Sequence, residues 1–352
     1  MIYDFYIPGS ILHSGDDTEN FFKTGVEISN NISLLFVDLY GGMYSKFIGV
    51  IFYLYGVDRL LVQFLNILFF IFSVIVIRKI IILLNIKNYK ILMVIIFFFP
   101  HSLIFSSILL RESLISFLIV VSFYYFLKWA KQQRYAYAFV CLMFVMLAAL
   151  FHSGVIGLAL GYIVGIIIIT NDENKILLNN PKKIILLLVT LITLIFIMFS
   201  NNILDLPFLN KFQQYFESNE TIYDITNINK GTNAYLNTVV IDTPLDFIVY
   251  SPLKLLYFII SPVPWEIKSL STMIAFCLDG LFYLIFTLYI VKNYRFILKN
   301  PLLLSIFIGI IATYLIFSIG VSNAGTAMRH RFKLFYIIII FVFLLHKRKK
   351  EI

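Results

Sequence analysis

Long apolar runs alternate with short polar connections over most of this 352-residue chain. An α-helix rises 1.5 Å per residue, so about 20 consecutive apolar residues are needed to cross the hydrocarbon core of a bilayer. The pattern predicts nine transmembrane helices, at residues 60–84, 91–110, 113–130, 135–151, 155–170, 184–200, 271–291, 301–320 and 334–346.

Two further apolar stretches, 33–56 and 245–263, are interrupted by residues such as Gly41, Gly42 and Pro252. Such breaks are typical of re-entrant or interfacial helices, and we favour an interfacial position for both. The chain is therefore expected to be an all-α, polytopic integral membrane protein with about nine to eleven transmembrane or re-entrant helices. Because no repeat or Pro/Gly/Ser linker divides it, residues 1–352 are expected to form a single transmembrane domain.

The composition fits a lipid environment, since 61% of the residues are hydrophobic and 13% are charged, against roughly 25% charged in a soluble domain. The apolar runs are too long for barrel strands, which alternate over about 10 residues. Both cysteines, Cys141 and Cys277, lie inside apolar runs, which indicates small buried side chains rather than a disulfide. No spacing of His, Cys, Asp and Glu resembles a set of metal ligands, so neither a metal nor a cofactor is expected.

The net charge of +9 comes from short basic clusters between the apolar runs, not from one soluble face, so nucleic acid is not an expected partner. Cytoplasmic loops of membrane proteins retain Lys and Arg. If the spans alternate, five clusters share one side: Arg78, Lys79, Lys87 and Lys90; Lys128, Lys131 and Arg134; Lys175, Lys182 and Lys183; Lys292, Arg295 and Lys299; and Lys347, Arg348, Lys349 and Lys350. This side is the predicted cytoplasm. The C-terminus is then cytoplasmic, and residues 1–32 and 201–247 are extracytoplasmic segments.

The same topology places several ionisable residues at the extracytoplasmic ends of spans, where charge is costly and usually functional. The first are Arg111 and Glu112, in a tight turn between two apolar runs. A guanidinium at the membrane surface can hold a phosphate through two hydrogen bonds and neutralise the charge on a departing diphosphate. The alternative is an interfacial Arg–Glu pair that caps the following helix.

A second candidate is the segment NAGTAMRHRFK at residues 323–333, with Arg329, His330 and Arg331 in succession. Consecutive helical residues point in different directions, so at most two of these three can share one target, whereas Arg329 and Lys333 share a face. The alternative is anchoring of the last span by interfacial cations. We favour phosphate binding, because anchoring cations are disfavoured on the extracytoplasmic side.

Three further segments carry candidate site residues. His152, in the motif FHSG, either accepts a proton from a sugar hydroxyl or makes a structural hydrogen bond within the bundle. Asp16 and Asp17, in a GDDTEN segment expected to be flexible, suit a general base, oxygen ligands for a divalent ion, or a helix cap. Trp265, in SPVPWE, either lines a lipid or sugar site or anchors the chain at the membrane surface. The candidate catalytic residues are His152, Asp16, Asp17 and Glu112.

We expect these residues to meet in one pocket that faces away from the cell interior. Arginines suit a diphosphate, aromatic side chains can stack on sugar rings, and apolar helix flanks can receive a polyprenyl tail within the bilayer. The pocket therefore predicts a lipid-linked glycan as the substrate.

In layout the chain resembles the bacterial polysaccharide polymerases of the Wzy and EpsG type, which are themselves similar to the GT-C membrane glycosyltransferases. The resemblance is carried by GDDTENFF, FFFPHSLIFSSILLRESLISFLIVVSFYYF, FHSG, SPVPW and NAGTAMRHR, which spread over most of residues 14–335. Two features depart from the pattern. Such proteins usually begin with a transmembrane helix, whereas this sequence starts in a polar segment, and EpsG-like proteins often have glutamine where this chain has Glu112.

The resemblance implies transfer of a glycan from undecaprenyl diphosphate to a second lipid-linked glycan at the outer face of the bacterial cytoplasmic membrane, without a nucleotide sugar. Arg111, His152, Arg329 and Arg331 are the matching functional positions. A flippase and a chain-length regulator of the same pathway are expected partners, together with the bilayer itself.

Two alternatives remain open at this point. One is a GT-C transferase that uses a polyprenyl-phosphate sugar donor, and the other is a non-enzymatic flippase or transporter for lipid-linked sugars. A transporter places charges along a path through the bilayer. The middles of most predicted spans lack charge, which favours an enzyme that works at the membrane surface.

Overall fold

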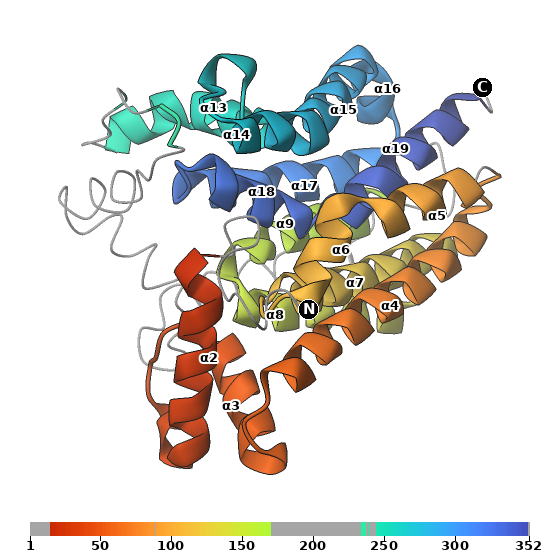
Figure 1. The fold of residues 1–352 in the computed structure, drawn as a ribbon. Coiled ribbons are helices and arrows are strands. Elements are labelled where there is room, and N and C mark those ends of the chain that lie inside the picture. Colours follow the sequence, from red (N-terminus) through yellow and green to blue (C-terminus); the bar gives the residue numbers. More distant parts are fainter. Residues whose placement is uncertain (1–14, 88, 170–233, 237–238, 240–243, 351–352) are drawn as a thin grey trace.

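The computed structural model describes residues 15–87, 89–169, 234–236, 239 and 244–350 (Figure 1). Within these ranges the chain is helical, and its β pairing is limited to an isolated bridge between Ala234 and Asn323. The elements are α2 (Gly15–Asn30), η1 (Ile32–Phe36), α3 (Met43–Tyr55), α4 (Arg59–Leu84), α5 (Tyr89–Phe98), α6 (Pro100–Ser107), α7 (Glu112–Gln132), α8 (Tyr135–Phe151), η2 (Ser153–Ile156), α9 (Gly157–Ile168), α13 (Pro244–Ile260), η3 (Pro264–Glu266), α14 (Leu270–Ala275), η4 (Phe276–Gly280), α15 (Leu281–Lys292), α16 (Tyr294–Lys299), α17 (Pro301–Ile319), α18 (Ala324–Phe332) and α19 (Phe335–Lys350).

Within the described ranges, four helical segments are long and apolar enough to cross a membrane: α4, α7, α17 and the continuous segment Leu270–Lys292, which comprises α14, η4 and α15. The bent pair α5 and α6 makes a fifth if it is one span. The described part of the chain is therefore that of an all-α membrane protein. The predicted count of nine to eleven membrane helices is not confirmed, because four or five segments meet the criteria within the described ranges.

Several predicted spans match the helices closely, and others differ for physical reasons. The predicted span at 91–110 is broken, because α5 and α6 meet at 47° and α6 begins at Pro100, which has no backbone N–H to continue a helix. The predicted spans at 135–151, 155–170 and 334–346 correspond to α8, to η2 with α9, and to α19. Each of these is shorter than the about 20 residues that usually cross a bilayer. The predicted span at 184–200 and most of the segment 201–247 lie outside the described residues.

The helices α17 and α19 occupy the centre of the bundle. In Figure 1 the segment α13–α16 lies on one side of them and α4–α8 lie on the other. Every residue from Phe335 to Phe341 is buried, as expected for a helix that is apolar all round and surrounded by other helices. On α9, Gly161 approaches Gly309 of α17 so closely that a side chain would overlap the partner backbone, which is how small residues allow membrane helices to pack.

The sequence predicts that the acidic GDDTEN segment is flexible. In the structure these residues instead form the start of the helix α2. Phe21 of α2 meets Tyr44 of α3, and Gly25 meets Ile48 further along, so the two helices run in the same direction. With 13 residues, α3 is about 20 Å long and too short to cross the bilayer. This agrees with an interfacial position for the stretch 33–56 rather than a span.

Candidate functional site

The turn that carries Arg111 is fixed by a side chain from another helix. Between the end of α6 and the start of α7, the amide of Asn66 on α4 donates to the carbonyls of Ile108 at 2.8 Å and Leu110 at 2.9 Å. These bonds satisfy carbonyl groups that a helix end would leave without a partner. The guanidinium of Arg111 then donates to the carbonyl of Phe151 at 3.2 Å, at the C-terminal end of α8, where the helix dipole favours a cation.

Glu112 lies in the first turn of α7 and is shared between two cations. Its Oε1 atom lies 3.3 Å from a guanidinium nitrogen of Arg329 and 3.3 Å from Nζ of Lys333. Arg329 and Lys333 thus reach one target from one helix face, as their spacing predicts. The alternative of an Arg111–Glu112 pair that caps the helix is not what forms, because the ion pairs of Glu112 in the described chain go to α18 and the residue that follows it.

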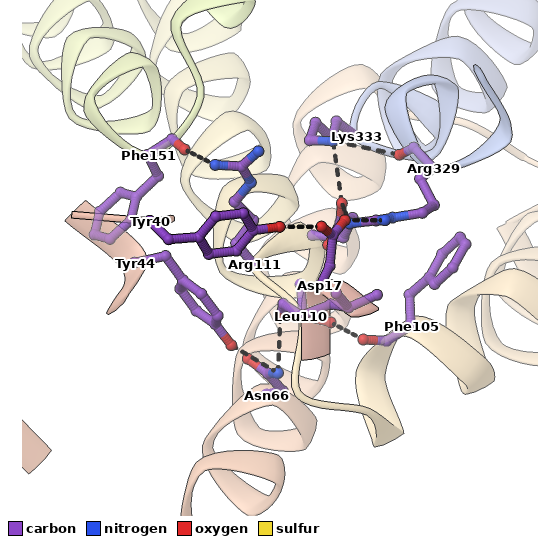
Figure 2. Close-up of polar contacts among 12 residues, drawn as sticks. Asp17, Tyr40, Tyr44, Asn66, Phe105, Leu110, Arg111, Phe151, Arg329 and Lys333 are labelled. Carbon is purple, nitrogen blue, oxygen red and sulfur yellow. Dashed lines mark hydrogen bonds and ion pairs between the residues drawn. The ribbon is translucent and has the colours of Figure 1, made fainter. Parts of the chain in front are cut away.

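The N-terminal helix contributes an acid to the same place. Arg329 donates to Asp17 Oδ2 at 2.5 Å, and the Tyr40 hydroxyl donates to the other oxygen of Asp17. Figure 2 shows Tyr40 and Arg329 approaching Asp17 from opposite sides. Burial and the neighbouring Asp17 carboxylate raise the pKa of Tyr40 to about 12. The side chain of Asp16 lies outside the described part of the structure.

These contacts join Asp17, Tyr40, Glu112, Arg329 and Lys333, and Arg111 lies close enough to interact electrostatically with four of them. The six residues Asp17, Tyr40, Arg111, Glu112, Arg329 and Lys333 are called the polar cluster. Three of its polar atoms are buried without a hydrogen-bond partner in the described chain, namely Arg111 Nε, Glu112 Oε2 and Arg329 Nε. Buried polar atoms are nearly always satisfied, and exceptions are frequent at functional sites. Three cations face two carboxylates in this cluster, so its excess charge favours an anion.

Two histidines lie beside the polar cluster. The ring of His152, at the end of α8, lies 4.7 Å from the ring of His330 on α18, and both rings lie 4.9 Å from Phe317 of α17. His152 directly follows Phe151, which accepts the hydrogen bond from Arg111. The structure therefore brings together side chains from α2, α7, α8 and α18, which are far apart in the sequence.

Arg331 does not belong to this cluster, and its predicted role as a substrate-binding residue is corrected. Its side chain is fully buried and donates to the carbonyls of Phe258 at 2.8 Å, Ile259 at 2.7 Å and Ser261 at 2.5 Å, and to the Asp279 carboxylate. Two positions along a helix correspond to about 200° of rotation, so Arg329 and Arg331 face opposite ways. Arg331 instead compensates the last carbonyls of α13.

Sequence reasoning missed this second buried site. Asp279 lies in the π-helical turn η4, inside the candidate span Leu270–Lys292, and its Oδ1 atom lies 4.0 Å from Nδ1 of His101. Arg331 also packs over the Tyr283 ring, at 4.9 Å from its centroid. The available signal was a lone acid in an otherwise apolar run, which is costly in a membrane and usually has a partner.

The remaining candidate, Trp265, lies away from the polar cluster. Trp265 lies in η3 with 70% of its surface exposed, which fits the surface-anchor interpretation better than a place in the polar cluster.

Lys333 and Tyr40, which were not among the predicted site residues, belong to the polar cluster. Lys333 is fully buried, and burial lowers its pKa to about 7, although Glu112 acts in the opposite direction. Among the described residues, no group of three His, Cys, Asp or Glu side chains is arranged to hold a metal ion.

Comparisons of the sequence with models of protein families, with curated proteins and with solved structures find no match. The fold and the polar cluster define a helical membrane protein with a cationic, partly neutralised site at one end of its bundle.

Proposed function

We propose that the protein is a polysaccharide polymerase that joins undecaprenyl-diphosphate-linked oligosaccharide units at the extracytoplasmic face of a bacterial cytoplasmic membrane. The observation that supports this most is the convergence of Arg329 and Lys333 on Glu112, with Arg111 close enough to interact with it electrostatically and with buried arginine donors that have no partner in the described chain. Arginine binds phosphate through its planar fork of donors. The Wzy and EpsG resemblance and a GT-C-like layout belong to the same proposal.

In the proposed reaction, a hydroxyl oxygen of the acceptor glycan forms a bond to the anomeric carbon of the donor glycan. The bond from that carbon to the diphosphate breaks, and its electron pair leaves with undecaprenyl diphosphate. Arg111 and Arg329 stabilise the negative charge that develops on this leaving group. The proton of the hydroxyl passes to a base, for which Glu112, His152 and Asp17 are the candidates in reach of the cluster.

The test is Arg111→Ala in a strain that makes the polysaccharide. Loss of one group that stabilises the developing charge typically lowers turnover by about 100-fold or more. We expect polymer to disappear and single lipid-linked repeat units to accumulate on the outer leaflet. Lys23→Ala, on the exposed face of α2, is the matched control and should leave polymer unchanged. Normal polymer with Arg111→Ala would rule out this role.

One observation favours the alternative of a flippase. Asp279 and His101 are ionisable residues within the membrane-spanning part of the bundle, and such residues are typical of transport paths. The leaflet on which repeat units accumulate in the Arg111→Ala strain distinguishes the two functions. A defective flippase leaves repeat units on the cytoplasmic leaflet, whereas a defective polymerase leaves them outside. A GT-C transferase is distinguished by its donor, because it takes a polyprenyl-phosphate sugar and not a diphosphate-linked glycan.

A further inference from the structure

The helices α2 and α3 pack into a pair whose two outward faces differ in chemistry. The exposed residues of α2 in its second half are polar: Lys23, Glu27 and Asn30. The exposed residues of α3 are apolar or aromatic: Met43, Val50, Tyr53, Leu54 and Tyr55. A pair with one polar face and one apolar face is amphipathic as a unit, although α3 alone has almost no polar residues.

The inner faces of the pair show why these outer faces point in opposite directions. A side chain at Gly25 of α2 would overlap Ile48 of α3, and one at Gly49 of α3 would overlap Ile28 of α2. Each helix therefore turns its small residues toward the other at close range. The polar face of α2 and the apolar face of α3 are what remain on the two outer sides.

The position of the pair places the apolar face next to the membrane-facing surface of the bundle. Figure 1 shows α2 and α3 extending from one end of the bundle, across the direction of α4, with α3 on the side nearer α4. The ring of Phe47 on α3 lies 6.4 Å from Phe69 of α4 and 6.4 Å from Phe151 of α8. α4 also exposes Phe64 and Phe72, so α3 and the candidate span that it contacts both carry exposed apolar side chains.

We propose that the α2–α3 pair lies on the surface of the bilayer, with the exposed face of α3 embedded among phospholipid head groups and upper acyl chains. Phospholipid is the occupant because α3 contacts a candidate membrane span through Phe47 and is itself too short to cross the bilayer. Lys46, on the same helix, extends an apolar stem with an ammonium that suits lipid phosphates. Asp17 and Arg329 then lie level with the head groups, which, on the proposed function, lets a lipid diphosphate reach them without leaving the membrane.

The test measures the depth of two positions on opposite faces of the pair. In a Cys277→Ser background, Leu54→Cys and Glu27→Cys each carry an environment-sensitive fluorophore, and the full chain is placed in nanodiscs of phosphatidylethanolamine and phosphatidylglycerol. Quenching is measured with iodide in water and with lipids that are spin-labelled near the head group or near the chain end. Val50→Cys is a second probe of the apolar face if Leu54→Cys does not fold.

We expect head-group-labelled lipid to quench the probe at residue 54, and iodide to quench the probe at residue 27 several-fold more strongly than the one at 54. Three results would overturn the proposal. Equal iodide quenching at both positions would mean that α3 stands clear of the membrane. Stronger quenching by chain-end labels at 54 would mean deep insertion, and protection from both quenchers would mean that another protein surface covers α3. None of these measurements requires the proposed enzymatic activity, so the two proposals can fail separately.

Discussion

The Glu112 carboxylate and the Lys333 ammonium are both buried, and Glu112 also serves Arg329. Burying an ion costs several kcal/mol, and the attraction of a partner offsets that cost only when the pairing is good. A carboxylate shared between two cations pairs each of them incompletely. Lys333 responds through its lowered pKa, about 7, because burial disfavours its charged form more than Glu112 supports it.

This shift predicts how the stability of the protein depends on pH. The folded-state pKa of Lys333 is about 7 and the ordinary value is 10.5, so between these values the unfolded chain binds more protons than the folded one. Stability then rises with pH in this window, by up to about 1.4 kcal/mol per pH unit. Thermal unfolding in detergent from pH 7.5 to 9.5 measures this slope. Lys333→Met should flatten it, and an equal slope in the variant would contradict the assignment.

The buried pair of Asp279 and Arg331 makes a second prediction at the scale of residues. Asp279→Asn leaves the fully buried guanidinium with carbonyl acceptors but without a counter-charge, and the expected loss of unfolding free energy is about 3 to 5 kcal/mol. Replacing both residues, with Asp279→Leu and Arg331→Met, removes the unpaired charge and should recover much of that loss. Denaturation of the wild type, Asp279→Leu, Arg331→Met and the double variant in detergent gives the coupling. Additive single effects would contradict a direct pair.

At the scale of helices, the hydrophobic pattern predicts where a helix lies along the chain better than it predicts whether that helix is continuous. The apolar run at 301–320 forms α17, Pro301–Ile319, and the run at 113–130 forms α7, because apolar length alone determines such spans. The break in the run at 91–110 was readable from Pro100. The π-helical turn at η4 was not, since no local residue type requires it and packing around Asp279 accompanies it.

The polar cluster was predictable only in part, because the sequence shows which side chains share a helix face but not how the helices pack against each other. Helical periodicity shows that Arg329 and Lys333 share a face and that Arg331 does not share it. It does not show which of the two faces meets Glu112, because that depends on how α18 lies against α7. The contribution of Tyr40 was equally hidden, since it comes from a connection whose path is set by the packing of α2 on α3.

The contact between α9 and α17 gives a prediction at the same scale. A methyl group at Gly161 would overlap the backbone of Gly309 and the carbonyl of Ser305, so the two helices would have to separate. We expect Gly161→Ala to lower the unfolding temperature clearly, because overpacking typically costs about 1 to 3 kcal/mol. The control is Gly320→Ala, at the end of α17, where an added methyl meets nothing within 4 Å. Equal unfolding temperatures for the two variants would show that the close approach is not maintained.

For the whole molecule, the distribution of charge between the two ends of the bundle has a consequence for orientation. At the end away from the polar cluster, Lys347 donates to the carbonyl of Leu84 at 2.8 Å and Lys349 donates to Asn293 at 2.9 Å. The last residues of α4, the start of α16 and the basic end of α19 thus meet there. α19 runs to this end from Phe335, two residues after Lys333 of the cluster. The basic end of α19 and the polar cluster are therefore separated by the length of α19.

Cytoplasmic retention of Lys and Arg then predicts that the polar cluster faces away from the cytoplasm. Alkaline phosphatase, which is active only outside the cytoplasm, should be active when fused after Ser322, where the chain has passed through α17 to the cluster end. The same fusion after Lys350 should be inactive, and a fluorescent protein at that position should be bright. The reverse pattern would place Arg111 and Arg329 on the cytoplasmic side. A polymerase acting on exported lipid-linked glycans would then be excluded, because its substrate would lie on the opposite face of the membrane.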